Sequence, residues 1–165
     1  PPPSQGTTMS RLPACIVAAD AAARTTATNY PEHLATRVAG RTKRPLGDPF
    51  GLTAFGVNLT TLPPGAMSAL HHQHSKQDEW VYVLKGTVTL HRGDASYVMT
   101  AGMCTGFPAG GEVHHLENTS DEDVVILEVG NRVEGDAVAY PEDDLAAVLG
   151  ADGLWRMMHK DGRPY

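Results

Sequence analysis

The sequence is poor in cysteine and has no excess of positive charge. Its 165 residues include only two cysteines, Cys15 and Cys104, which lie far apart in the chain. This excludes a disulfide framework and favours reduced, buried thiols. Thirteen basic residues stand against 19 acidic ones, and the formal net charge is −6. A nucleic-acid partner is therefore not expected, because such partners bind surfaces rich in lysine and arginine.

Long apolar runs are also missing. No stretch is long and apolar enough to span a bilayer, so no membrane partner is expected. The mildly apolar residues 12–23 are interrupted by Pro13 and Asp20 and make a poor secretory signal. These features predict a cytoplasmic protein.

Glycine and proline are plentiful, with 17 and 12 residues respectively, which is typical of a turn-rich β protein. From residue 50 onward, short alternating segments are separated by glycine or proline turns, and residues 123–129 form a nearly continuous apolar run. Strands are predicted at residues 50–62, 66–74, 79–85, 87–91, 95–100, 104–107, 113–118 and 123–129. Strands of this length and spacing predict an all-β sandwich or barrel, in one domain for a chain of this size.

The segments on either side of the predicted barrel have other patterns. We expect residues 1–10 to be a disordered leader or an expression remnant, 11–45 an N-terminal arm with an edge strand at 34–40, 46–132 the barrel, and 133–165 a C-terminal helix and tail. The helix is predicted because proline and three acids precede an apolar run, residues 145–149, that ends at Gly150.

A small basic cluster lies in the predicted arm. Its members are Arg37, Arg41, Lys43 and Arg44. The favoured interpretation is a solvated arm or an edge strand protected by charge. The alternative is a contact with an anionic substrate or with an acidic neighbouring subunit.

The strongest chemical signal is a group of histidines and one glutamate. His72 and His74 are two residues apart and so point to the same face of an extended strand. A polar turn follows, and Glu79 then opens the next strand, which can return its carboxylate toward the two imidazoles. Downstream, His114 follows a turn made by Pro108 and two glycines. We expect these four side chains to bind one metal ion.

Taken together, these two stretches resemble the motifs of the cupin superfamily. The first motif is matched by Gly65, His72, His74, Glu79 and Gly86, and the second by Gly102, Pro108, Gly110, His114 and Asn118. The resemblance implies a double-stranded antiparallel β-barrel, or jelly roll, and a homodimer. A register shifted by one residue would replace a ligand by His71 or His115, but the spacing to Glu79 and Asn118 favours the first assignment. His71, Gln73 and His115 then belong to the opposite face, and His91 and His159 to the surface.

Three imidazoles and one carboxylate leave two adjacent positions of an octahedron open for a small oxygen-bearing metabolite. This set suits one divalent ion of Zn, Mn, Fe, Ni or Co. The resemblance implies a metal-dependent enzyme, of the sugar or sugar-phosphate isomerase or epimerase type. An Fe(II)-dependent dioxygenase and a non-catalytic module that binds a metal and a small molecule remain as alternatives. The sequence identifies no general base, and the catalytic residues stay unassigned.

Overall fold

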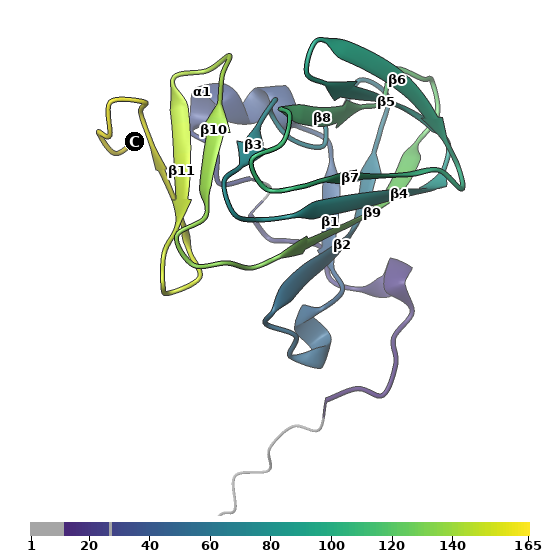
Figure 1. The fold of residues 1–165 in the computed structure, drawn as a ribbon. Coiled ribbons are helices and arrows are strands. Elements are labelled where there is room, and N and C mark those ends of the chain that lie inside the picture. The colour runs from purple at the N-terminus through teal and green to yellow at the C-terminus, as the bar shows by residue number, and fades with distance from the viewer. Residues whose placement is uncertain (1–11, 27) are drawn as a thin grey trace, which may run out of the picture.

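Antiparallel strands dominate the computed structural model, which describes residues 12–26 and 28–165 (Figure 1). The predicted leader lies outside the described residues. The strands are β1 (Thr42–Pro45), β2 (Phe55–Leu62), β3 (Gln73–His74), β4 (Glu79–Lys85), β5 (Thr87–Arg92), β6 (Ala95–Thr100), β7 (Cys104–Phe107), β8 (His114–Glu117), β9 (Val124–Asn131), β10 (Ala137–Tyr140), β11 (Leu145–Leu149) and β12 (Trp155–Met158). The helical elements are η1 (Ala18–Asp20), α1 (Glu32–Ala35), η2 (Thr36–Val38) and η3 (Asp48–Phe50).

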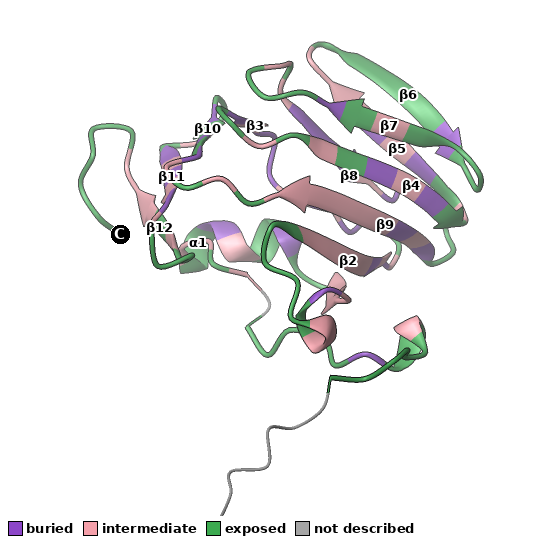
Figure 2. Ribbon diagram, turned by 60° about the horizontal axis from the view of Figure 1, so that its bottom comes forward, coloured by how far each residue is buried: buried purple, intermediate pink, exposed green. Residues whose placement is uncertain are grey.

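The strands form three antiparallel sheets. The first has the order β1-β2-β9-β4-β7, the second β12-β11-β10-β3, and the third β6-β5-β8. The five-stranded and three-stranded sheets enclose the main core, whose members include Leu62, Val83, Ile126, Val88 and Leu116. Figure 2 shows buried residues concentrated on these strands and exposed ones on the loops and on β6. The prediction of an all-β, jelly-roll fold is confirmed.

One glycine of the first motif has a clear backbone role. Gly86 joins β4 to β5 with a φ of +84°, a conformation that side chains with a Cβ rarely adopt. A Cβ at this position would lie 3.1 Å from the carbonyl oxygen of Asp123. Glycine therefore allows the close approach of the β4–β5 turn to the start of β9.

The predicted C-terminal helix is wrong. The segment Leu145–Leu149 is strand β11, paired with β10 on one side and β12 on the other. Its burial alternates with a period of two, with Leu145, Ala147 and Leu149 buried, because the strand packs one face against α1 and η2. The acidic residues before it form a turn between β10 and β11 rather than the first turn of a helix.

The predicted edge strand at residues 34–40 is also wrong. This segment contains the end of α1 and η2, and it buries Leu34 and Val38 against β10 and β11. The edge strand of the arm lies slightly later, at β1, which pairs with β2. The arm therefore contributes both a strand and a helical cover to the body of the protein.

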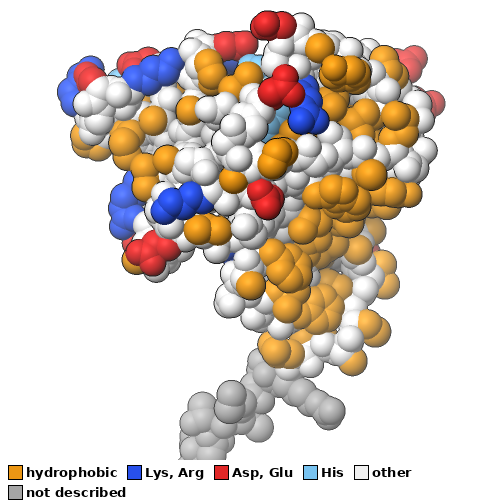
Figure 3. Space-filling model, viewed as in Figure 1, with side chains coloured by type: hydrophobic (Ala, Val, Ile, Leu, Met, Phe, Trp, Pro, Cys, Tyr) orange, Lys and Arg blue, Asp and Glu red, His pale blue; other side chains and the backbone are white. Residues whose placement is uncertain are grey.

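Some apolar surface remains uncovered. The exposed large side chains include Leu12, Val17, Phe55, Leu84 and Val98. Figure 3 shows hydrophobic side chains gathered at the lower right of the view, toward the purple N-terminal segment of Figure 1. Among the described residues, no helix has the length and apolar character needed to cross a membrane.

Candidate metal centre

The four predicted ligands come together at one end of the barrel. His72 lies just before β3 and His74 ends it. Glu79 is the first residue of β4, and His114 is the first residue of β8. Two backbone hydrogen bonds join His72 to His114, from His72 N to His114 O at 3.2 Å and from His114 N to His72 O at 2.8 Å. The sheet hydrogen bonds thus fix the backbone that carries these side chains.

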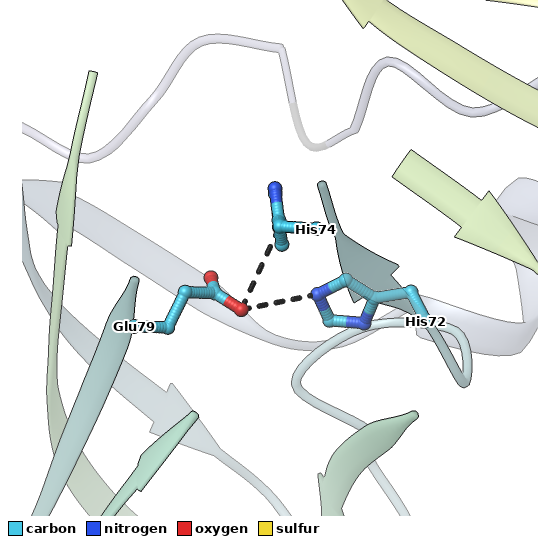
Figure 4. A group of neighbouring side chains, drawn as sticks. All are labelled: His72, His74 and Glu79. Carbon is cyan, nitrogen blue, oxygen red and sulfur yellow. Dashed lines mark ion pairs between the residues drawn. The ribbon is translucent and has the colours of Figure 1, made fainter. Parts of the chain in front are cut away.

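The carboxylate of Glu79 lies at the centre of the group. Its Oε2 is 3.4 Å from His72 Nε2, 3.5 Å from His74 Nε2 and 2.9 Å from His114 Nε2. Figure 4 shows Glu79 pointing from β4 toward the two histidines of the first motif. Two ligand atoms about 2.1 Å from an ion lie about 3 to 3.5 Å apart when they are adjacent in its coordination shell. One ligand atom from each of His72, His74 and Glu79 lies within 4.8 Å of the other two, so the spacing of these three fits one transition metal ion, and His114 adjoins them through Glu79.

The second nitrogen of each ring determines which atom can face an ion. His72 Nδ1 donates to the carbonyl oxygen of Leu70 at 2.8 Å, His74 Nδ1 to Asp136 Oδ2 at 2.5 Å, and His114 Nδ1 to the carbonyl oxygen of Glu112 at 3.2 Å. Carbonyl and carboxylate oxygens only accept, so the proton of each neutral ring belongs on Nδ1.

Three Nε2 lone pairs and one carboxylate consequently face one another. A proton on one Nε2 would satisfy a single contact, whereas a divalent cation can take lone pairs from His72, His74 and Glu79 at once. Such second partners on Nδ1 are also the usual companions of metal-ligating histidines. The chemistry of the donor set therefore fits a metal ion.

The electrostatics favour the ligand forms of these groups. Burial raises the pKa of Glu79, but the neighbouring rings of His114, His72 and His74 outweigh it, and the pKa lies well below its ordinary value. Burial lowers the pKa of His114. At neutral pH the glutamate is thus a carboxylate and His114 is a neutral imidazole, which are the forms that bind metal.

A fully buried carboxylate that the sequence did not single out supports the group. Asp136 accepts hydrogen bonds from the backbone N–H of Lys76 at 2.7 Å and of Gln77 at 3.2 Å, besides the one from His74. It thereby holds both the ring of His74 and the turn between β3 and β4. Asp136 lies 62 residues from His74, and nothing in the local pattern connects the two.

The other motif residues have different places. Asn118 is fully buried, and its Nδ2 donates to the carbonyl oxygens of Leu62 and Glu122, both at 2.7 Å, so it fixes the loop after β8. His71 and His115 contact each other, with their Nδ1 atoms 2.8 Å apart, and do not join the group around Glu79. The histidines that contact Glu79 are therefore His72, His74 and His114, as in the first assignment, and not His71 or His115.

The four side chains open into a cavity of about 1230 Å³. Its walls include Arg24, Tyr30, Arg41, Lys43, Glu128, Tyr140 and Trp155. Tyr140 stacks near the ring of His72, with centroids 6.0 Å apart, and Tyr30 meets Tyr140 edge to face at 5.7 Å. Burial raises the pKa of both phenols, so both carry their protons at neutral pH.

Two members of the basic cluster also face this cavity. Lys43 lies beside Glu128, with Nζ 2.8 Å from Oε2. Arg41 donates to the carbonyl oxygen of Ser68 and lies over the ring of Tyr30, and its buried Nε has no partner among the described residues. The interpretation of the basic cluster as a solvated arm or a charge-protected edge strand holds only in part: residues 42–45 form the edge strand β1, but Arg41 and Lys43 line the cavity. Their i, i+2 spacing at the start of β1 is the signal that could have shown it.

Comparison with known proteins agrees with this geometry. The family model of the cupin domain matches residues 58–130. A solved structure described as a sugar phosphate isomerase from a cupin superfamily, from Silicibacter pomeroyi DSS-3, is 37% identical, with a TM-score of 0.78 over 84% of this chain and 88% of that one. The chain belongs to the cupin superfamily.

Two further relatives are informative. A provisionally assigned sugar phosphate isomerase from Acidithiobacillus ferrooxidans ATCC 23270 is 31% identical, with a TM-score of 0.68 over 76% of this chain and 80% of that one. The xanthan biosynthesis protein XanB of Xanthomonas campestris pv. campestris (strain B100) is 31% identical over 91 residues, 54% of this chain. This chain spans only 19% of the length of that curated relative.

Proposed function

We propose that this cupin is a metal-dependent isomerase whose substrate is a small hydroxy-carbonyl compound with an anionic group, of the sugar-phosphate type. One observation carries the proposal: the group around Glu79 and the guanidinium of Arg41 face the same cavity. A cation site and a fixed positive charge together suit a substrate that has oxygens at one end and an anion at the other. The names of the two solved structures from Silicibacter pomeroyi and Acidithiobacillus ferrooxidans support the same substrate class.

His72, His74, Glu79 and His114 would hold the ion. When bound, a divalent ion supplies Lewis-acid polarisation of a carbonyl or hydroxyl oxygen. The remaining chemistry belongs to side chains on the cavity wall.

Arg41 is the group that we assign to the anion. Its Nε has no partner among the described residues, and the cavity is where a partner can enter. A guanidinium binds phosphate or carboxylate through charge-assisted and often paired hydrogen bonds. Arg24, whose Nη2 donates to Asn58 Oδ1 at 3.3 Å, lies on the same wall and adds a second positive charge.

Proton transfer needs a donor and an acceptor beside the substrate. Tyr140 is next to His72 and keeps its proton, so its hydroxyl can donate to a substrate oxygen. Glu128 projects from β9 opposite Val81, on the inner face that also carries Glu79. We assign Glu128 as the base. It is not a ligand of the proposed metal ion, and Lys43 and the hydroxyl of Thr60 hold its carboxylate in place.

The test is a set of metal-reconstitution assays with aldose and ketose phosphates in deuterated water. An isomerase exchanges the carbon-bound proton and interconverts the sugars with Zn(II) or Mn(II) in the absence of oxygen, which nuclear magnetic resonance detects. Turnover only with Fe(II) and oxygen would instead assign the chain to the dioxygenases. Tight sugar-phosphate binding by calorimetry without exchange or turnover would make it a binding module.

A further inference from the structure

A second histidine cluster lies on the outer face of the three-stranded sheet. His91 of β5 and His115 of β8 are direct cross-strand partners, and their rings stack with centroids 4.5 Å apart. Glu117 lies two residues after His115 and so projects from the same face. Its Oε2 is 3.1 Å from His91 Nε2. These three side chains point away from the cavity.

We propose that His91, His115 and Glu117 form a second site for a divalent transition metal ion such as Zn²⁺. One ligand atom from each residue lies within 4.8 Å of the other two. Imidazole nitrogens and a carboxylate oxygen are a ligand set that zinc accepts, with water in the fourth position. The cross-strand pairing places both histidines on a rigid backbone, as a metal site requires.

The far nitrogens of the two rings are already engaged. His91 Nδ1 is 3.0 Å from Ser96 Oγ, and His115 Nδ1 is 2.8 Å from His71 Nδ1. A hydroxyl and a neutral imidazole can each accept a hydrogen bond as well as donate one. Both rings can therefore carry their hydrogen on Nδ1 and direct Nε2 toward an ion without losing these partners. His71 acts as a positioning residue, not as a ligand.

The site combines one buried side chain with two partly exposed ones, so an ion can reach it from the solvent. His115 is buried, whereas the side chains of His91 and Glu117 are 29% and 35% exposed. The two rings are nearly parallel, 12° apart, so His91 has to tilt to bring its Nε2 onto a shared ion. Its exposure leaves room for that movement, while the buried ring supplies a fixed point.

The outer site lies directly behind the candidate metal centre. His114 and His115 are consecutive residues on β8, and their side chains project to opposite faces of the sheet. An ion at the outer site would tie β5 to β8 and so brace the strand that supplies His114. The outer site does not depend on the proposed isomerase activity.

The test is equilibrium dialysis of the full chain, freed of metal by a chelator, against Zn²⁺, followed by metal analysis. We expect two equivalents per chain for the native protein and one for His91→Ala and for Glu117→Gln. With two ligands left, affinity for the lost equivalent should fall by at least about 10-fold. His33→Ala, which removes an exposed histidine of α1, is the matched control and should retain two. Circular dichroism melts establish that each variant is folded.

The outcomes separate the two sites. Two equivalents in His91→Ala, or a single native equivalent that His74→Ala removes, overturns the outer site and leaves the proposed metal centre in place. A single equivalent that His91→Ala removes supports the outer site and contradicts the inner one. Absence of bound zinc overturns both. Zinc-edge anomalous diffraction from native crystals must also show a peak between His91 Nε2 and His115 Nε2.

Discussion

Two histidine clusters lie on the inner and outer sides of β8, which supplies His114 to one and His115 to the other, and they differ in what holds their rings. On the inner face, His74 Nδ1 faces a carboxylate and His72 Nδ1 faces a carbonyl oxygen, and neither partner can donate. On the outer face, the partners are a hydroxyl and another imidazole, which can do both. The inner tautomers are therefore fixed before any ion arrives, whereas the outer ones remain free to change.

This difference predicts how each cluster responds to a metal. Fixed lone pairs that face a carboxylate are preorganised, so an inner ion needs little rearrangement. Binding of an ion at the outer site requires one of several tautomer arrangements and a tilt of the partly exposed ring of His91. Both requirements lower the affinity of this site. We expect the inner site to bind Zn²⁺ more tightly than the outer one, and the following changes test that order.

The largest expected effect comes from removing an inner ligand. His74→Ala should abolish metal-dependent turnover and lower the affinity of the inner site by more than about 100-fold, because the loss also leaves Asp136 without its ring partner. Metal analysis after dialysis and assays of reconstituted protein measure both quantities. His33→Ala is the control and should behave as native. Full occupancy and activity in His74→Ala would remove His74 from the ligand set.

A smaller effect is expected when the partner of an inner ligand is changed. Asp136→Asn presents an amide to His74 Nδ1, and an amide N–H at that position would push the ring proton to Nε2, where it blocks the ion. Inner-site affinity should fall about 10- to 100-fold. Asp144→Asn is a matched control, because Asp144 bonds the half-buried His159, away from both clusters, at 2.8 Å. Zinc titration calorimetry compares the two variants, and equal losses would show that the effect is general rather than local.

The cavity wall gives an intermediate test of substrate binding. Arg41→Met should raise the KM for a phosphorylated substrate about 10- to 100-fold, the value of a charge-assisted hydrogen bond, and should leave zinc affinity at both sites nearly unchanged. Arg37→Met, which removes an arginine that pairs with Asp143 on the surface, is the control. Steady-state kinetics measure the change. An unchanged KM would mean that the anion binds elsewhere in the cavity.

The sequence predicts the barrel strands because they depend on local alternation. The spacing of His72 and His74 predicts that they share a face. The apolar run after Glu79 predicts the strand that begins there. The C-terminal strands were missed because acids before an apolar run also mark helix starts, and only the pairing of Leu145–Leu149 with two neighbours decides between them.

The residues of the cavity wall could not be predicted from the sequence for another reason. Tyr30 and Tyr140 are 110 positions apart by their numbers in the chain, yet their rings touch. Asp136 bonds His74 across 62 positions of the chain. Such contacts depend on how three sheets and a helical arm pack together. Residue types and their spacing in the sequence do not predict such contacts.

The smallest expected effect concerns the hydroxyl that holds the outer ring. Ser96→Ala should weaken Zn²⁺ binding at the outer site only a few-fold, because His91 is partly exposed and water can replace a neutral partner. It should leave the inner site untouched, in contrast to Asp136→Asn. Thr87→Val, which removes an exposed hydroxyl of β5 that belongs to neither cluster, is the control. Site-resolved zinc titration measures the ratio of the two affinities. A loss as large as that of Asp136→Asn would show that the outer ring is held as firmly as the inner ones, and the contrast between the two faces would then be wrong.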